Sequence, residues 1–309
     1  MTDHLHDLLI VGGGPAGLSA GIYAARDGLD CILLEGRVPG GQLTGIAEIA
    51  NYPGFPGTVS GFELAEKMRG QAAAFGLNIA AEEARGISRR NDRIEVACAG
   101  GVHAARAVII ATGATLKKLG VPGENRLTGR GVSYCGTCDG PLFRDRRVAV
   151  VGGGDTAVEE AVFIARFAAR VTLIHRRNAL RASPGLQRRA FGEKKIDFCW
   201  NSVVREIRGQ ERVCGVVVGN PGEAGETREI PCEGVFIFVG SAPNTGFLKG
   251  VVDLDEAGRI VVDGSMAASL PGVFAAGDVR SGSVRQIASA VGDGVTAVLR
   301  AEIFLGVHG

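Results

Sequence analysis

Two cysteines separated by two residues, Cys135 and Cys138, stand in the segment SYCGTCDG, and Asp139 follows them directly. This spacing suits half of a zinc site, a structural disulfide or a redox-active dithiol. A zinc site needs further ligands, and the chain has no second C-x-x-C and no spaced histidine pair beyond His4 and His6. A permanent disulfide is rare in a reducing cytoplasm. The pair therefore favours a redox dithiol whose thiolate is the attacking species.

The composition is that of an ordinary globular protein. Of the 309 residues, 46% are hydrophobic and 22% are charged, with a formal net charge of +1. These values give no bulk reason to expect nucleic acid or an anionic membrane as a partner. The start, MTDHLHDLLIVGGG, has no signal-peptide pattern, and its apolar run is too short to span a membrane. We therefore expect a cytoplasmic protein, with the cysteines outside the C-x-x-C acting as small core or strand residues.

The elements that would position the dithiol occur as two copies of one unit. Residues 8–37 and residues 148–177 each have an apolar strand, a glycine turn, an amphipathic helix and a second apolar strand. This order is typical of a dinucleotide-binding unit, in which a pyrophosphate lies at the helix N-terminus. The matched positions are Gly12 and Gly152, Gly14 and Gly154, Gly17 and Ala157, and Glu35 and His175. Two copies predict two dinucleotides.

The residues that follow the second strands distinguish the two ligands. Glu35 can accept hydrogen bonds from ribose hydroxyls and would repel a 2′-phosphate, which suits FAD. At the same place in the second unit stand His175, Arg176 and Arg177, with Arg181 further on. Guanidinium groups suit a 2′-phosphate, although a solvated basic strand end would have the same composition. We therefore expect FAD in the first site and NADPH in the second.

The order of the segments predicts an α/β fold with two Rossmann-like dinucleotide-binding domains, one inserted into the other. One buried strand, over 105–114, and a second through GVFIFVGSAPNT would be the points where the chain leaves one domain for the other. The expected divisions are 1–113 and 246–309 for a split FAD domain and 114–245 for an inserted NADPH domain with the dithiol. A helix starting near Arg285 would present its N-terminus to the flavin.

Seven motifs spread over the whole chain carry a family resemblance. They are GGGPAG at 12–17, GGQL at 40–43, ATG at 111–113, CGTCDG at 135–140, GGGDTAVEEA at 152–161, HRRNALR at 175–181, and AAGDV at 275–279 with RQ at 285–286. With these motifs the chain resembles the low-molecular-weight, bacterial-type thioredoxin reductases. Gly136 departs from the usual alanine and could loosen the turn between the cysteines. Pro184 should start or break a helix that the family usually continues.

The resemblance implies FAD and NADPH as cofactors and no metal. The cofactor-binding residues expected on these motifs are Gly12, Gly14, Pro15, Ala16, Gly17, Glu35, Gly36, Gly40, Gly41, Gln42, Leu43, Asn51, Thr112, Gly113, Gly152, Gly154, Asp155, Thr156, Ala157, His175, Arg176, Arg177, Arg181, Gly240, Gly277, Asp278, Arg285, Gln286 and Ile287. The resemblance also implies a homodimer and thioredoxin as the protein substrate.

By the same resemblance, hydride passes from NADPH to FAD, and the reduced flavin reduces the Cys135–Cys138 disulfide. Cys138 would be the sulfur next to the flavin, and Cys135 would attack thioredoxin through a mixed disulfide. Asp139 would act as the acid–base group, although it could instead only cap a helix. The rivals are a flavin-dependent dithiol oxidase, a non-catalytic dinucleotide sensor and a reductase of another thioredoxin-like carrier. The HRR cluster argues against the oxidase.

One geometric demand follows from this scheme. The nicotinamide and the dithiol must both reach the flavin, yet both belong to the inserted domain. We therefore expect that domain to rotate between two poses about hinges near residues 114–118 and 243–246.

Overall fold

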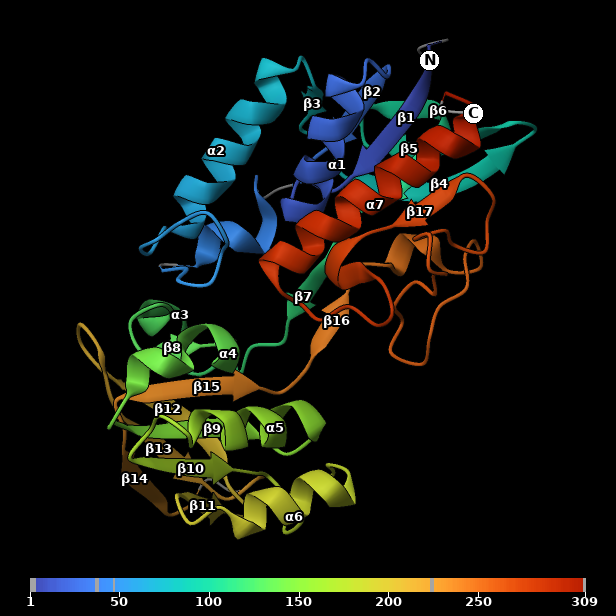
Figure 1. Cartoon of the computed structure of the whole chain (residues 1–309). Helices are drawn as coiled ribbons and strands as arrows, with labels where there is room; N and C mark the ends of the chain where they lie inside the picture. The colour runs from blue at the N-terminus through green and yellow to red at the C-terminus, as the bar shows by residue number, and fades with distance from the viewer. Residues whose placement is uncertain (1–3, 37–38, 47, 223–224, 308–309) are drawn as a thin grey trace. The chain divides into compact units, whose positions relative to one another are not determined.

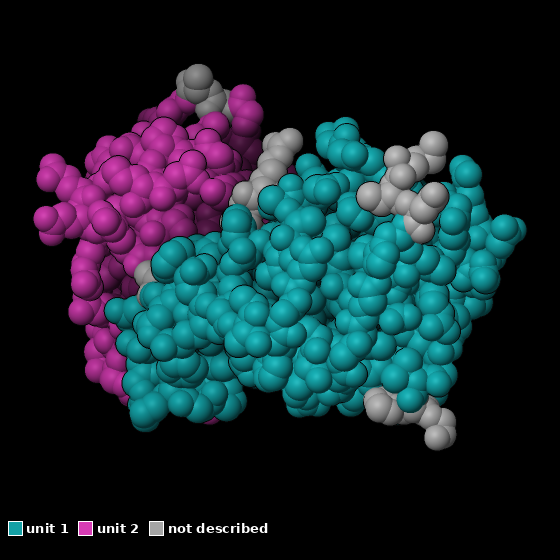
Figure 2. All heavy atoms as spheres, turned by 90° about the horizontal axis from the view of Figure 1, so that it is seen from above, with its two compact units in different colours: residues 1–115, 242–309 teal, residues 116–241 magenta. Residues whose placement is uncertain are grey.

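The computed structural model describes residues 4–36, 39–46, 48–222 and 225–307. The chain forms two compact units, residues 1–115 with 242–309 and residues 116–241. Figure 1 traces the chain through both units, and Figure 2 colours the first teal and the second magenta. The chain thus leaves the first unit after residue 115 and returns at residue 242, where the expected divisions were 113 and 246.

The first unit contains a seven-stranded sheet in the order β3-β2-β1-β6-β5-β4, with β17 also pairing with β6. Its strands are β1 (Leu5–Val11), β2 (Cys31–Leu34), β3 (Asn78–Ala80), β4 (Ala84–Arg90), β5 (Arg93–Cys98), β6 (Gly101–Ile110) and β17 (Val273–Ala275). The helices are α1 (Pro15–Arg26), α2 (Gly61–Ala74) and α7 (Ile287–Leu305). β2, β17, residues 8–11 of β1 and residues 107–110 of β6 pair in parallel and alternate between two core clusters, so both faces are covered and these stretches are continuously apolar.

The second unit repeats this plan around a five-stranded sheet in the order β11-β10-β9-β15-β8. Its strands are β8 (Val132–Ser133), β9 (Arg147–Gly152), β10 (Arg170–Ile174), β11 (Ile196–Cys199) and β15 (Gly234–Phe238). One face packs on α5 (Asp155–Ile164) and α6 (Pro184–Gly192). The other packs on a three-stranded sheet of β12 (Val203–Gly209), β13 (Val213–Gly219) and β14 (Thr227–Pro231). Two short helices, α3 (Glu124–Leu127) and α4 (Gly136–Asp139), complete the unit.

Both predicted strand–turn–helix–strand units are confirmed as β1-α1-β2 and β9-α5-β10. Their glycines allow each helix to approach the strand before it. A Cβ added at Gly17 would overlap the carbonyl oxygen of Gly12. In the second unit Ala157 stands at the matching place, and its Cβ is 2.5 Å from the position of a Cβ at Gly152. The predicted α/β fold with two Rossmann-like units is therefore correct.

The strand expected through 234–245 is in fact two strands. β15 ends at Phe238, and β16 (Ser241–Pro243) pairs instead with β7 (Ala114–Leu116) in a separate two-stranded sheet. The break falls at Gly240, whose φ of 113° lies outside the strand region. The strand expected over 105–114 likewise ends at Ile110.

Pro184 starts α6, as predicted. In the part of the chain described, no helix has both the length and the apolar character to cross a membrane.

Candidate active site: a redox disulfide and two dinucleotide sites

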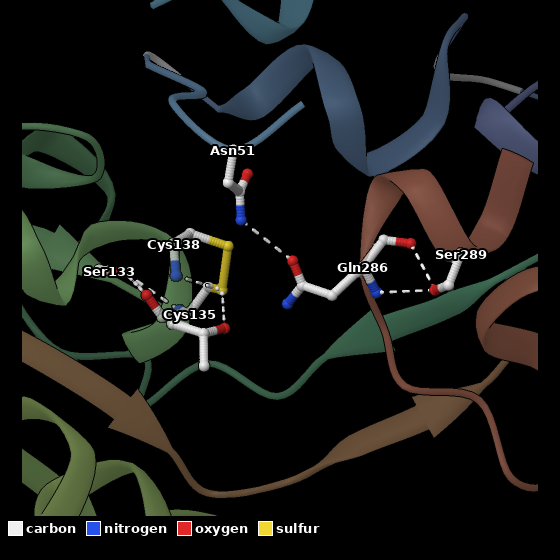
Figure 3. Close-up of a disulfide and its surroundings, with 7 residues drawn as sticks. Asn51, Ser133, Cys135, Cys138, Gln286 and Ser289 are labelled. Atoms are coloured by element: carbon white, nitrogen blue, oxygen red, sulfur yellow. Dashed lines mark hydrogen bonds between the residues drawn. A yellow bond between two sulfur atoms is a disulfide. The ribbon is translucent and has the colours of Figure 1, made fainter. Parts of the chain in front are cut away.

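The two cysteines of the C-x-x-C form a disulfide in the second unit. Cys135 and Cys138 are bonded through their sulfurs, with Cα atoms 5.3 Å apart (Figure 3). Cys135 is the N-cap of α4, and its Sγ accepts a hydrogen bond from the backbone N–H of Cys138 at 3.2 Å. Ser133 Oγ accepts from Cys135 N at 3.1 Å and donates to Cys135 O at 3.2 Å. The strand before the pair thus fixes the backbone of the first cysteine.

The polar contacts favour Cys135 as the sulfur that carries negative charge after reduction. The Thr137 hydroxyl lies 3.4 Å from Cys135 Sγ, and it is the donor because a disulfide sulfur has no hydrogen. Hydrogen bonds to a thiolate stabilise it relative to the thiol. Two donors, the Cys138 N–H and the Thr137 hydroxyl, therefore face the Cys135 sulfur. Both cysteines are half-buried, so the pair is reachable at the surface of its unit.

Gly136, between the cysteines, has a packing role that the sequence did not reveal. It is buried in the first turn of α4, and a Cβ there would overlap the Glu160 carboxylate of α5. The same Cβ would lie 3.1 Å from Ile164 Cδ1. The missing side chain therefore makes room for Glu160 against the turn of the dithiol.

We expect Gly136→Ala to change the free energy of unfolding by less than about 1 kcal/mol in the native background, because the helical gain of alanine is offset by displacement of Glu160. In a Glu160→Ala background the same substitution should stabilise by up to about 1 kcal/mol. Thermal unfolding of the four variants measures this coupling. Additive effects of the two substitutions would contradict the packing that we describe.

Asp139 ends α4 and is half-buried. It also stands at the N-cap position of the following 3-10 turn, Gly140–Phe143, but its side chain makes no capping hydrogen bond there. The cap of α4 itself is the Cys135 sulfur. Asp139 thus occupies an N-cap position, as the alternative role expected, but without the side-chain hydrogen bond of a cap.

A buried carboxylate that sequence reasoning missed anchors the residue before the dithiol. Glu124 is 1% exposed and accepts hydrogen bonds from Leu119 N at 3.0 Å, Gly120 N at 2.7 Å and the Tyr134 hydroxyl at 2.8 Å. Burial, followed by the bond to Glu124, raises the pKa of Tyr134. A single glutamate in PGENRL has no pattern that would have identified it as buried.

The first candidate dinucleotide site lies where three distant segments meet at the N-terminus of α1. A Cβ at Gly41 would lie 3.4 Å from Gly14 Cα, and one at Gly277 would lie 3.1 Å from Ala16 Cβ. Pro15 and Gly17 lie in the first turn of the helix. Apart from its two neighbours in the chain, no described residue has a heavy atom within 4 Å of a Cβ built at Gly14. The open space beside the helix N-terminus fits a pyrophosphate.

Glu35 is held at the end of β2 with both carboxylate oxygens engaged. It is 4% exposed, and its Oε1 accepts from Gly40 N at 2.8 Å. Its Oε2 pairs with Arg69 of α2, a residue that sequence reasoning missed. A carboxylate has further lone pairs, so the arrangement still fits a ribose hydroxyl. Gly36 is exposed beside it, whereas Leu43, in the 3-10 turn Gly41–Gly45, has its side chain in the core.

Amide side chains expected near the flavin also come together. Asn51 Nδ2 donates to Gln286 Oε1 at 3.2 Å, and Gln286 forms a capping box with Ser289 at the start of α7 (Figure 3). Gln42 Nε2 donates to the carbonyl of Ala114. Arg285, directly before Gln286, has a φ of 55°, and Ile287 is the first residue of α7.

The turn that carries Asp278 is fixed by an ion pair that the sequence did not reveal. Arg280 donates to both oxygens of Asp293, at 2.7 and 2.8 Å, and Asp293 also accepts from Gly277 N at 3.0 Å. Ser283 Oγ donates to Asp278 Oδ1 at 3.3 Å. Burial nevertheless raises the pKa of Asp278.

Thr112 and Gly113 lie at the crossing between the units and contact Asn244. Thr112 Oγ1 donates to Asn244 O at 2.9 Å, and Asn244 Nδ2 donates to Thr112 O at 2.8 Å. Asn244 N also donates to Gly113 O at 3.0 Å. Two of the expected cofactor residues thus belong to a hydrogen-bonded clamp on the chain crossing. Gly240 lies just outside it, where its carbonyl accepts from Lys117 N at 2.9 Å.

The second candidate dinucleotide site combines a buried imidazole with exposed guanidinium groups. His175 is 5% exposed and packs so closely that a Cβ at Gly153 would overlap its ring. Burial, and then the charge of Arg181, lower the pKa of His175, which favours the neutral ring. Arg181 N donates to Gly153 O at 2.7 Å, which fixes this arginine beside the glycine turn.

The arginines of this site are available to an anion. Arg176, Arg177 and Arg181 are exposed and form no ion pair with any residue in the described part of the chain. Clustered guanidinium groups without carboxylate partners fit a phosphate. Asp155 Oδ1 accepts from Ser183 N at 2.8 Å, and this bond lowers the pKa of Asp155. The Asp155 carboxylate therefore links the segment after Arg181 to the start of α5. Gly154 is the N-cap of this helix, and the exposed Thr156 and the buried Ala157 lie in its first turn.

Comparison with known proteins assigns the chain to a family. The model of the pyridine nucleotide-disulphide oxidoreductase family matches residues 6–294. A thioredoxin reductase of Treponema pallidum is 44% identical over 97% of each chain. The crystal structure of thioredoxin reductase from Streptococcus pyogenes is 44% identical, with a TM-score of 0.94 over 99% of this chain and 100% of that one.

A second solved structure gives a lower TM-score. Lactococcus lactis thioredoxin reductase, described as the FR conformation, is 43% identical and covers 98% of this chain and 100% of its own, with a TM-score of 0.66. Family model, relatives and structures agree over nearly the whole length. The chain belongs to the pyridine nucleotide-disulphide oxidoreductase family and, within it, to the thioredoxin reductases.

Proposed function

We propose that this chain is an NADPH-dependent, FAD-containing thioredoxin-disulfide reductase whose redox centre is the Cys135–Cys138 pair. The observation that carries the proposal is the disulfide on α4, in the same unit as the arginine-lined dinucleotide site. A zinc site would need the two sulfurs apart as thiolates, together with further ligands. A dithiol that closes into a disulfide is what an electron relay requires.

The two dinucleotide sites supply the cofactor assignment. Glu35, the open space at Gly14 and the loop of Gly40 and Gly41 would hold FAD, which when bound supplies two-electron transfer between a nicotinamide and a disulfide. Arg176, Arg177 and Arg181 would hold the 2′-phosphate of NADPH. Because these arginines form no ion pair with described residues, a phosphate could bind to them without displacing a carboxylate of that part of the chain.

The reduced pair would act on thioredoxin by thiol–disulfide exchange. The Cys135 thiolate attacks one sulfur of the thioredoxin disulfide, forming a mixed disulfide and releasing the other sulfur as a thiolate. The Cys138 thiolate then attacks Cys135 Sγ, which restores the Cys135–Cys138 disulfide and frees the second thioredoxin sulfur. Asp139, next to Cys138 in the chain, is proposed to donate a proton to a leaving thiolate.

We also propose that the second unit rotates against the first during turnover. The chain crosses between the units only near residues 115 and 242, and Asn244 clamps one crossing to the other. Solved relatives of nearly equal identity give TM-scores of 0.94 and 0.66, a spread that rotation of one unit would produce.

A photocleavable cross-link between the units is expected to stop steady-state turnover while leaving at most one half-reaction active in single-turnover experiments. Each pose serves one electron transfer, so a locked enzyme cannot complete the cycle. Photolysis should restore turnover, and a sample treated with reagent blocked at one end controls for modification alone. Full steady-state activity in the locked enzyme would contradict the rotation.

The function itself is tested with the purified, flavin-loaded chain. NADPH or NADH is supplied as donor, and thioredoxin with a disulfide dye as acceptor. We expect turnover that requires both NADPH and thioredoxin, and its absence would overturn the proposal. Oxygen consumption driven by a small dithiol would identify an oxidase, and turnover only with another thioredoxin-like protein would identify another carrier.

We further propose that the protein is a cytoplasmic homodimer. Light scattering of the purified chain measures the number of subunits.

A further inference from the structure

A group of metal-binding side chains lies in the first unit away from the glycine turn. Cys98 ends β5, His103 lies near the start of β6, and Glu82 belongs to the loop between β3 and β4. The glycine turn of the first dinucleotide site follows the other end of β1, which runs parallel to β6. The group is therefore not part of either dinucleotide site or of the dithiol.

The backbone pairing of the β5–β6 hairpin places two of these residues on one face. Cys98 pairs with Gly101, and Val96 pairs with His103, so the Cys98 and His103 side chains lie on the same side of the hairpin. Glu82 reaches this place from its own loop, with His103 Nε2 and Glu82 Oε2 3.3 Å apart. All three ligand atoms lie within 4.8 Å of one another.

These separations suit one bound ion. Ligands of a tetrahedral site with bonds of about 2.0–2.3 Å lie roughly 3.3–3.8 Å from one another. The observed separations reach that range with small side-chain movements. The His103 and Glu82 side chains are 17% and 30% exposed, so the site is partly shielded but open to an ion from solvent.

The chemistry of the three groups selects the class of ion. A thiol, an imidazole and a carboxylate together favour a borderline divalent cation such as Zn²⁺ over Mg²⁺ or Ca²⁺, which prefer oxygen. Burial, and then the Glu82 charge, raise the pKa of the Cys98 thiol to about 11, while Arg85 acts against this. The thiol therefore keeps its proton without a metal. A bound dication forms a bond to the sulfur and releases that proton to solvent.

We propose that Glu82, Cys98 and His103 form a binding site for one zinc-type divalent ion, with a fourth position for water. The ion would join the β5–β6 hairpin to the loop before β4. It would also occupy the Cys98 sulfur, which is then unavailable for oxidation. This site is independent of the function proposed above.

A neighbouring group must be separated from this site by experiment. His4 Nε2 and His6 Nδ1 lie 2.6 and 3.1 Å from the two oxygens of Asp30. The rings of His6 and His103 have centroids 6.5 Å apart. The second group has no sulfur, so a thiolate signal distinguishes the two.

The test uses the full chain with FAD bound and without NADPH, so that the Cys135–Cys138 disulfide stays closed and cannot bind metal. Metal-free protein is titrated with Co²⁺ and followed by difference absorption, and zinc binding is measured by competition with a chromophoric chelator. We expect one equivalent of metal and a thiolate-to-cobalt charge-transfer band. Cys98→Ser should abolish the band and weaken zinc binding by more than about 100-fold, and His103→Gln and Glu82→Gln should also weaken it.

Matched variants make each outcome decisive. Cys214→Ser removes an exposed thiol outside the group, and a His4→Ala/His6→Ala double variant removes the neighbouring histidines. Both should keep the charge-transfer band. Absence of stoichiometric binding, a band that survives Cys98→Ser, or binding that only the His4/His6 variant removes would each overturn the proposal. NADPH–thioredoxin turnover, measured in parallel, reports separately on the proposed function.

Discussion

Cys138→Ser is expected to lower steady-state turnover with thioredoxin by at least ~10³-fold and to trap a stable mixed disulfide through Cys135. Loss of a catalytic nucleophile typically removes most of the rate enhancement. Without the second thiol, the intramolecular attack on Cys135 Sγ that releases the bound thioredoxin is lost. Mass spectrometry of the reduced variant mixed with oxidised thioredoxin measures the adduct, and flavin absorbance measures retained FAD.

The matched variants separate chemistry from folding. Cys135→Ser should lose turnover to the same extent but trap no adduct, because the sulfur that attacks is missing. Cys214→Ser, which removes a free exposed thiol of the same unit, should leave turnover unchanged. An adduct with Cys135→Ser and none with Cys138→Ser would reverse the roles given to the two sulfurs. Loss of flavin from either variant would show that the disulfide is structural.

Replacement of Arg176 and Arg177 by alanine is expected to lower kcat/KM for NADPH by roughly 10²- to 10⁴-fold. Each charge-assisted hydrogen bond contributes about 1.5–3 kcal/mol, and about 1.4 kcal/mol corresponds to a tenfold change. The value for NADH, which has no 2′-phosphate, should change by less than about threefold. Steady-state kinetics with both donors measures the ratio.

The control is Arg212→Ala, which removes an exposed arginine in the turn between β12 and β13 of the same unit. It should leave the preference for NADPH unchanged. Equal losses for NADPH and NADH in the double variant would show that the arginines support the fold or another step. An unchanged preference would place the phosphate elsewhere.

Much of the fold and site could be predicted from local patterns. The two strand–turn–helix–strand units follow from apolar runs and glycine spacing over about 30 residues, and both are present as β1-α1-β2 and β9-α5-β10. The division of the chain between β15 and β16 was missed, since the apolar run continues through Gly240 and only its positive φ breaks the strand.

The sequence by itself determined which kind of chemistry to predict. Two cysteines at C-x-x-C spacing, Glu35 after one strand and HRR after the other are local arrangements whose meaning depends on residue type and spacing. They sufficed to predict a redox pair and two dinucleotide sites. These groups lie close together in the chain, so their arrangement can be read as a motif in the sequence.

Only the tertiary structure decided which residues hold these groups in place. Arg69 beside Glu35, Asp293 beside Gly277 and Glu160 against Gly136 come from other helices, outside the short motifs that contain Glu35, Gly277 and Gly136. Each is a single charged residue in an amphipathic segment, where sequence cannot distinguish a solvated charge from a buried partner. The same holds for Glu82, Cys98 and His103, because a loop and two strands bring their ligand atoms together only after the sheet has formed.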